Sequence, residues 1–477
     1  MTRLTRAVAP MLLATLSASA QAANDADLAA IRDQIETLKH SYEQRIAALE
    51  ARLAQAETKA AAPAPLPADT GSASTYAAAS NPAMLHAGPA PANGFNPEIS
   101  LTLQGRYKNM KDVAERRISG FASASHDHAT NGVEGFSRRG FSVDHTELSL
   151  AANIDPYWRG QAIFAVLDGE TEVEEAWFQS LGLDHGLGLK AGRYLSGIGY
   201  LNEKHPHAWD FADAPLMYQA LFGEHGSYAQ DGLQVKWLAP TPVFLEFGAE
   251  IGRGANFPGS DRNSNDGGSH ALFAHVGDDL GDSHSWRAGL SYLRTRARER
   301  ESHFEDLNGM EAQGAFTGKS TTWIADFVWK WAPDGNPKYR NFTFQSEYFL
   351  RREQGDLSCR DEEGIGNLCA GDMTGDYHTR QSGAYVQGVY QFTPNWRAGL
   401  RYERLDSGNQ DLGANNATLT IDHYRPRRAT AMVDYSWSEF SRMRLQYAQD
   451  KSMRGLTDNQ ITLQYIMSLG AHGAHKF

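Results

Sequence analysis

Long apolar runs are missing from this sequence beyond its first residues. No later stretch approaches the run of about 20 apolar residues that a membrane-spanning helix needs, and the mean hydropathy is −0.50. A helical membrane protein is therefore excluded. Basic residues are also in deficit: 45 Lys and Arg stand against 57 Asp and Glu, for a formal net charge of −12. This acidity argues against a nucleic-acid partner.

Cysteine is scarce, since Cys359 and Cys369 are the only two in the chain. An isolated pair lacks the additional Cys or His residues of a structural zinc site. In an exported protein, a pair this close in sequence favours one local disulfide.

The common catalytic motifs are missing as well. There is no Gly-x-Ser-x-Gly elbow and no glycine-rich phosphate loop followed by a helix. His, Asp and Ser are so frequent in the predicted loops that finding them together there does not indicate a catalytic site. We therefore expect that the protein is not an enzyme.

The N-terminus has the pattern of a secretory signal peptide over residues 1–22. Arg3 and Arg6 form a basic region, an apolar stretch follows, and small residues mark a cleavage site at Ala22. No Cys follows that site, so a lipid anchor is not indicated. The pattern predicts an exported protein, in preference to a free amphipathic N-terminus.

Residues 23–58 predict a helix with a heptad seam, interrupted by one four-residue stutter. The seam consists of Leu28, Ile31, Ile35, Leu38, Tyr42, Ile46, Leu49, Leu53 and Ala56. A lone helix of this length is marginal in water, so self-association is favoured over docking on the same chain. The seam does not distinguish a dimer from a trimer. Residues 59–94, rich in Ala and Pro, predict a linker.

From residue 95 to residue 477 the chain consists of alternating, aromatic-rich stretches of about strand length. One face of 322–331 carries Trp323, Phe327 and Trp329, for example. Short and long connections alternate, with long ones that include 195–230, 297–319 and 354–379. Bacterial outer-membrane barrels have this asymmetry of loops.

We predict an all-β fold: a closed antiparallel transmembrane β-barrel of about 16 strands, with an N-terminal periplasmic α-helical coiled-coil segment. A barrel of this size encloses a water-filled lumen, and the loop at 195–230 is the candidate to narrow it. By strand parity, the pore-lining candidates are Arg106, Arg159, Lys190, Lys236, Arg287, Arg397, Arg401, Arg442 and Arg444. This set is either a basic ladder that favours anions locally or an ordinary solvated wall.

The stretch 186–216 resembles part of the phosphate-selective porin O and P family and its relatives. The matching residues are Gly192, Arg193, Tyr194, Gly197, Gly199, Asp213 and Pro215. The resemblance implies a trimeric sixteen-stranded porin with a constricting inward loop. The chain lacks the dense run of lumen lysines on which phosphate selectivity depends in that family, so phosphate specificity is not implied.

Histidines in the predicted outer loops suggest a further role. The pairs His126 with His128 and His205 with His207 lie near carboxylates such as Asp210 and Asp213. Imidazole binds zinc, copper and nickel, so these pairs are candidates for a weak metal site. The alternative is scattered polar surface. We expect no cofactor other than a weakly bound divalent metal.

The sequence therefore predicts a porin that forms a diffusion channel for small hydrophilic solutes, with anions or metal chelates as candidates. The alternatives are a histidine-loop zinc uptake or binding protein and a non-conducting adhesin or cell-wall tether. The expected location is the outer membrane of a Gram-negative cell, with the N-terminal segment in the periplasm. Expected partners are membrane lipid and lipopolysaccharide, two further copies in a homotrimer, peptidoglycan, and the barrel assembly machinery through the terminal Phe477.

Overall fold

The computed structural model describes residues 97–113, 116–121, 139–143, 145–167, 170–223, 226–360, 368–369 and 373–470. The predicted signal peptide, coiled coil and linker lie outside these ranges, as do His126, His128 and Phe477. Those assignments stay predictions.

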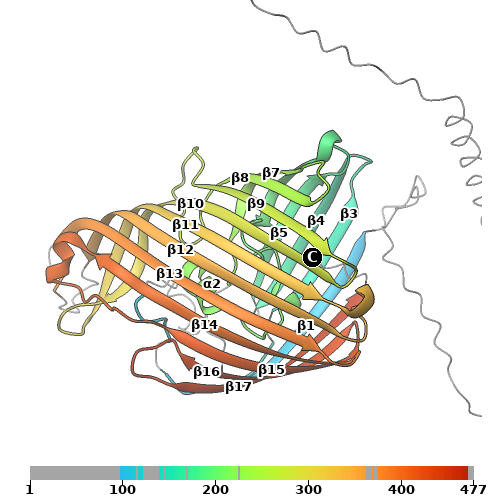
Figure 1. The fold of residues 1–477 in the computed structure, drawn as a ribbon. Helices are drawn as coiled ribbons and strands as arrows, with labels where there is room; N and C mark the ends of the chain where they lie inside the picture. Colours follow the sequence, from blue (N-terminus) through green and yellow to red (C-terminus); the bar gives the residue numbers. More distant parts are fainter. Residues whose placement is uncertain are drawn as a thin grey trace, which may run out of the picture. The chain divides into compact units, whose positions relative to one another are not determined.

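The described part of the barrel segment is almost entirely strand (Figure 1). Its strands are β1 (Glu98–Asn109), β2 (Gly140–Val143), β3 (Thr146–Asn153), β4 (Trp158–Leu167), β5 (Glu170–Ser180), β6 (Leu187–Leu195), β7 (Ala229–Leu238), β8 (Phe244–Gly252), β9 (Ser269–Leu280), β10 (His284–Glu305), β11 (Glu311–Trp331), β12 (Asn341–Arg360), β13 (Met373–Gln391), β14 (Trp396–Asp411), β15 (Arg427–Ser438), β16 (Ser441–Lys451) and β17 (Asp458–Gly470). Four 3-10 turns and one α-helix complete the described elements: η1 (Asp184–Gly186), η2 (Pro206–Ala208), η3 (Pro333–Gly335), η4 (Gly413–Ala417) and α2 (Leu216–Phe222).

The sheet closes on itself because β1 pairs antiparallel with β17 on one side and with β2 and β3 on the other. β2 opposes residues 105–108 of β1 and β3 opposes residues 98–102, so the two short strands share one position in the barrel. The seventeen strands therefore fill sixteen positions, and the predicted closed antiparallel sixteen-stranded barrel is confirmed.

Strand alternation separates an apolar exterior from a mostly polar interior. On β17, Ile461, Leu463 and Tyr465 are exposed on the outside, whereas Gln460 and Gln464 are buried on the inside. The same pattern recurs around the sheet. A closed sheet satisfies every backbone donor and acceptor, which allows its apolar exterior to face lipid. No helix among the described residues is long and apolar enough to cross a membrane.

Strands β10 to β14 are longer than the sequence predicted. Parts of the two stretches expected as loops, 297–319 and 354–379, are strand, because β10 extends to Glu305, β11 begins at Glu311, β12 extends to Arg360 and β13 begins at Met373. Since a tilted strand needs only about 9–11 residues to cross a bilayer, these strands extend beyond it. The β4–β5 connection is the exception to the alternation of short and long connections, because β4 ends at Leu167 and β5 begins at Glu170.

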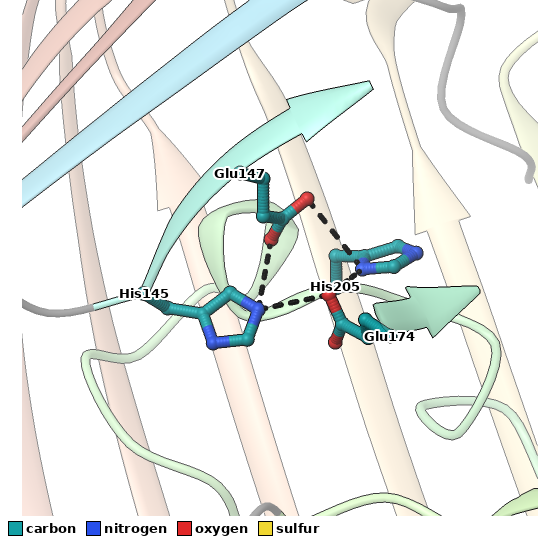
Figure 2. Close-up of side chains that lie close together, drawn as sticks. All are labelled: His145, Glu147, Glu174 and His205. Atoms are coloured by element: carbon teal, nitrogen blue, oxygen red, sulfur yellow. Dashed lines mark hydrogen bonds and ion pairs between the residues drawn. The ribbon is translucent and has the colours of Figure 1, made fainter. Parts of the chain in front are cut away.

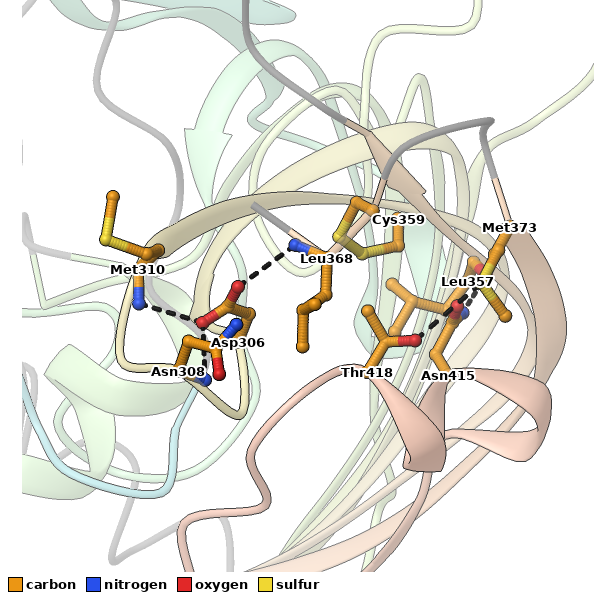
Figure 3. Close-up of a disulfide and its surroundings, with 10 residues drawn as sticks. Asp306, Asn308, Met310, Leu357, Cys359, Leu368, Met373, Asn415 and Thr418 are labelled. Carbon is orange, nitrogen blue, oxygen red and sulfur yellow. Dashed lines mark hydrogen bonds between the residues drawn. A yellow bond between two sulfur atoms is a disulfide. The ribbon is translucent and has the colours of Figure 1, made fainter. Parts of the chain in front are cut away.

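The extended strands enclose a small apolar core around a disulfide between Cys359 and Cys369 (Figure 3). Both cysteines are fully buried beside Phe316, Leu357 and Tyr377. The Asp306 carboxylate accepts hydrogen bonds from the backbone amides of Asn308, Met310 and Leu368, each at 2.8–3.0 Å. The β10–β11 turn is thereby tied to the disulfide segment.

Replacing both cysteines by serine should loosen this extension without affecting the transmembrane barrel. A disulfide that closes a loop of about ten residues contributes about 2–3 kcal/mol. Amide hydrogen exchange should therefore accelerate in the outer ends of β12 and β13 and stay unchanged in β16 and β17. Wild-type protein treated with dithiothreitol should match the variant, and equal exchange in oxidised wild type and variant would contradict the prediction.

An inward loop, a cavity and a histidine–glutamate cluster

The connection between β6 and β7, residues 196–228, lies inside the barrel, and we call it the inward loop. Its polar contacts reach strands around the whole circumference, which is possible only from within the lumen. They involve β1, β3, β8, β10, β12, β14 and β16. The segment predicted to narrow the lumen is thus the segment that occupies it.

The start of the inward loop is fixed by buried hydrogen bonds. The backbone amide of Ser196 donates to the Tyr228 carbonyl at 3.0 Å, and the Asn202 side chain bridges both ends of the loop. Further along, the amides of Tyr200 and Leu201 donate to the Glu347 carboxylate on β12. Gly199 has a positive φ of 67°, and a Cβ there would lie 2.8 Å from that carboxylate. Glycine is therefore required at the point where the chain turns into the lumen.

The middle of the inward loop carries α2, which packs on the lumen side of β13 and β14. Six of its seven residues are buried. They join an apolar core with lumen-facing side chains of the barrel wall, namely Phe273, Leu293, Ile324, Phe349, Tyr385 and Leu405. This half of the lumen is therefore filled by protein, in contrast to the water-filled interior expected from sequence.

Arginines on β14 and β15 hold the far part of the inward loop. Asp213 accepts from Arg401 and pairs with Arg428, each at 2.7 Å. Burial disfavours the charge on Asp213, but these two guanidinium groups outweigh it and hold its pKa well below the usual range. Asp210 accepts from Arg397 at 2.8 Å. The two aspartates proposed as metal partners of the loop histidines thus bind arginines instead, and that part of the metal prediction is wrong.

The nine predicted pore-lining residues have two roles. Arg159, Lys190, Lys236 and Arg287 line a cavity, and two of them, Lys236 and Arg287, also contact the inward loop. The others contact the inward loop, either at the two aspartates or at backbone carbonyls: Arg106, Arg397, Arg401, Arg442 and Arg444. Much of the basic ladder therefore fixes protein in place instead of facing solutes.

The cavity has a volume of about 1010 Å³ and lies beside β3 to β10. It runs from residues near the short-turn end, such as Leu181 and Pro242, to the inward loop at His205 and His207. Its charged lining is mixed, with bases Arg159, Lys190, Lys204, Lys236 and Arg287 and carboxylates Glu147, Glu175, Glu203, Glu246, Asp278 and Asp279. Such a lining suits hydrated solutes and gives no strong preference for one sign.

Histidines and glutamates lie close together at the end of the cavity next to His205 of the inward loop, which we call its inner end (Figure 2). His145 and Glu147 come from the start of β3, Glu174 from β5, and His205 from the inward loop. The ring of His207 stacks on that of His205, and its Nδ1 lies 2.9 Å from the Glu147 carboxylate. Burial disfavours protonation of His205, but Glu174 and Glu147 outweigh it and raise the pKa of that imidazole.

The sequence indicated His205 and His207 as metal candidates but not His145 or Glu174. In the β4–β5 pairing, Ile163 opposes Glu175 and Phe164 opposes Val173, so Glu174 is the extra residue of a β-bulge. Bulges re-aim side chains, and this one directs Glu174 to the lumen although alternation assigns it to the outside. Arg428 was also missed, although it lies on the buried face of β15 with Thr430 and Asp434.

A closed sixteen-stranded barrel with an apolar exterior and a polar cavity defines the class of outer-membrane β-barrels. No protein-family model matches the chain. A protein of Aquifex aeolicus (strain VF5), described as uncharacterized, is 30% identical to it over an alignment of 408 residues, which covers 80% of this chain and 80% of that protein. The chain belongs to the same family as that Aquifex protein.

Several solved outer-membrane barrels are similar in fold. The trimer form of OmpT, an outer membrane protein of Vibrio cholerae, has a TM-score of 0.47 at 10% identity and covers 78% of this chain and 99% of that one. OprB of Pseudomonas putida has a TM-score of 0.45 at 13% identity, covering 78% and 94%. For the outer membrane channel DcaP of Acinetobacter baumannii the values are 0.43 and 13%, covering 78% and 97%.

Proposed function

We propose that the protein is a porin: a passive diffusion channel for small hydrophilic solutes in a Gram-negative outer membrane. The observation that carries this proposal is the polar cavity beside β3 to β10, enclosed by a barrel whose exterior is apolar. Solutes would pass between this wall and the inward loop by electrodiffusion, without a covalent step. The mixed charge of the lining supports weak ion selectivity rather than a dedicated anion pathway.

Two further features belong to this proposal. Kinship with the phosphate-selective porin O and P family rests on the sequence resemblance around Gly192 and Pro215. A homotrimer is supported by the same resemblance and by the predicted coiled coil at 23–58, which would bring chains together in the periplasm.

Planar-bilayer recordings with full-length protein test the channel directly. We expect discrete open steps whose size scales with salt concentration, and a small reversal potential in a salt gradient. The variant D278N/D279N removes exposed carboxylates of the cavity and should shift selectivity toward anions. R159Q/K190Q should shift it toward cations, because each pair changes the lining charge by about two in opposite directions.

Lys338 provides the matched control, because it lies in a short turn and does not line the cavity. K338Q should leave the reversal potential as in the wild type. A barrel that inserts but never conducts would overturn the channel proposal and favour the adhesin or cell-wall tether.

A further inference from the structure

Three separate parts of the chain converge at the inner end of the cavity. One nitrogen each from His145 and His205 and one oxygen each from Glu147 and Glu174 all lie within 4.8 Å of one another. The β3 wall, the bulge of β5 and the inward loop each contribute at least one of these side chains.

The four ligand atoms lie within 4.8 Å of one another, so a small movement of the side chains would bring them to the coordination shell of a small divalent ion. His145 Nε2 lies 3.2 Å from Glu147 Oε1 and 3.0 Å from Glu174 Oε2. His205 Nδ1 lies 3.5 Å from Glu147 Oε2 and 3.1 Å from Glu174 Oε2. A tetrahedral zinc site with bonds of about 2.0–2.1 Å has ligand-to-ligand edges of about 3.3–3.4 Å. These four distances are close to that edge length.

The charge partners of the cluster also differ from those of other buried ion pairs in the lumen. Several buried carboxylates elsewhere pair with arginine, as Asp213, Glu353 and Asp434 do. Among the described residues, the ion pairs of Glu147 and Glu174 are all with histidines. Unlike arginine, a histidine can give up its proton and become a metal ligand. In addition, His205 Nδ1 is buried and makes no well-aligned hydrogen bond.

Surrounding groups contact two of the four side chains, Glu147 and His205. His207 Nδ1 contacts Glu147 Oε1 at 2.9 Å. Glu175 accepts from the Trp177 indole at 2.8 Å, and its carboxylate faces His205 Nε2 at 3.9 Å. Partners of this kind orient ligands in metal sites. Because Glu147 and His205 line the cavity, an ion can reach them from it.

We propose that His145, Glu147, Glu174 and His205 bind one divalent transition-metal ion, with zinc preferred. Two imidazole nitrogens and two carboxylate oxygens are a donor set that suits Zn²⁺. The bound ion would connect the inward loop to the barrel wall at the inner end of the cavity. This site does not depend on the proposed channel function, because a non-conducting barrel would bind the same ion.

Zinc binding to tag-free, full-length protein in detergent is measured by competition with a chromophoric chelator. We expect one zinc ion per chain with a micromolar or tighter dissociation constant. H205A and E174Q should weaken binding by about tenfold or more. H423A is the matched control, because His423 is an exposed histidine that bonds the Gly408 carbonyl away from the cavity. The H126A/H128A variant should likewise bind as the wild type.

Two readouts keep the test decisive if a variant folds poorly. Heat-dependent mobility on a gel reports whether each variant forms the barrel, and visible absorption of the Co²⁺-loaded wild type reports coordination without any mutation. An intense four-coordinate spectrum supports the site. Wild-type affinity in both H205A and E174Q overturns it. Loss of binding confined to H126A/H128A, or a weak six-coordinate spectrum, also overturns it.

Discussion

Replacing residues 197–227 by a short Gly-Ser linker will increase the single-channel conductance several-fold. The inward loop fills one half of the lumen through α2 and bounds the cavity in the other half. A sixteen-stranded barrel without such a loop encloses an open aqueous pore. The measurement is the conductance of single open steps in planar bilayers at fixed salt.

The shortened chain should still form a barrel because the two ends of the loop are neighbours. Ser196 and Tyr228 are joined by a backbone hydrogen bond of 3.0 Å, so a short linker spans the gap. Removal exposes apolar wall residues such as Phe273, Ile324 and Phe349 to water. The unfavourable free energy of this exposure arises at the lumen surface. The strand pairing and the lipid-facing surface stay intact.

The control for this deletion is the turn at the outer tip of the β10–β11 hairpin. Exchanging Leu307–Gly309 for Gly-Ser residues alters a segment that does not line the cavity. The single-channel conductance of this control variant should equal that of the wild type. If the inward-loop deletion conducts no better than this control, the loop is not the constriction and solutes take another path.

The barrel itself could be predicted from sequence because lipid imposes a regular pattern. Each membrane-spanning strand must present alternate apolar residues, and the alternating stretch at 322–331 is part of β11. The prediction failed where the pattern ends. Residues 296–305, with sequence RARERESHFE, continue β10 beyond the membrane, where neither face needs to be apolar. Pairing with β11, rather than composition, keeps this segment extended.

The site was harder to predict, because its parts meet through tertiary structure. The bulge that turns Glu174 inward leaves no mark in the alternation. One sequence signal was present but unused: Ile324 and Phe349 are apolar on the lumen side of their strands. Apolar residues facing a lumen indicate that protein, not water, fills it. Arg401 and Arg444 were predicted to line the pore, and only the structure shows that they hold the loop.

The Asp213→Asn substitution should release the inward loop, and Asp210→Asn should not. Asp213 is buried between Arg401 and Arg428, whose side chains are 2–3% exposed. Removing one member of a buried ion pair costs about 3 kcal/mol or more. Asp210 and Arg397 are each more than 20% exposed, and Arg397 keeps a second partner in Asp434. Partly exposed pairs contribute only about 0–1 kcal/mol.

Hydrogen exchange of the inward-loop amides measures this difference. A loss of about 3 kcal/mol corresponds to an opening equilibrium about 100-fold more favourable, so amides near Ala212 should exchange about that much faster in D213N. In D210N the change should stay within about fivefold. Because the pKa of Asp213 is lowered in the folded protein, its ion pairs stabilise the inward loop at pH values above the usual carboxyl range. This stabilisation is lost only as the pH falls below that range. The difference in amide exchange rate between D213N and wild type should therefore be the same at pH values of about 5 and 8. A difference that disappears at pH of about 5 would contradict the role of Asp213 in holding the inward loop.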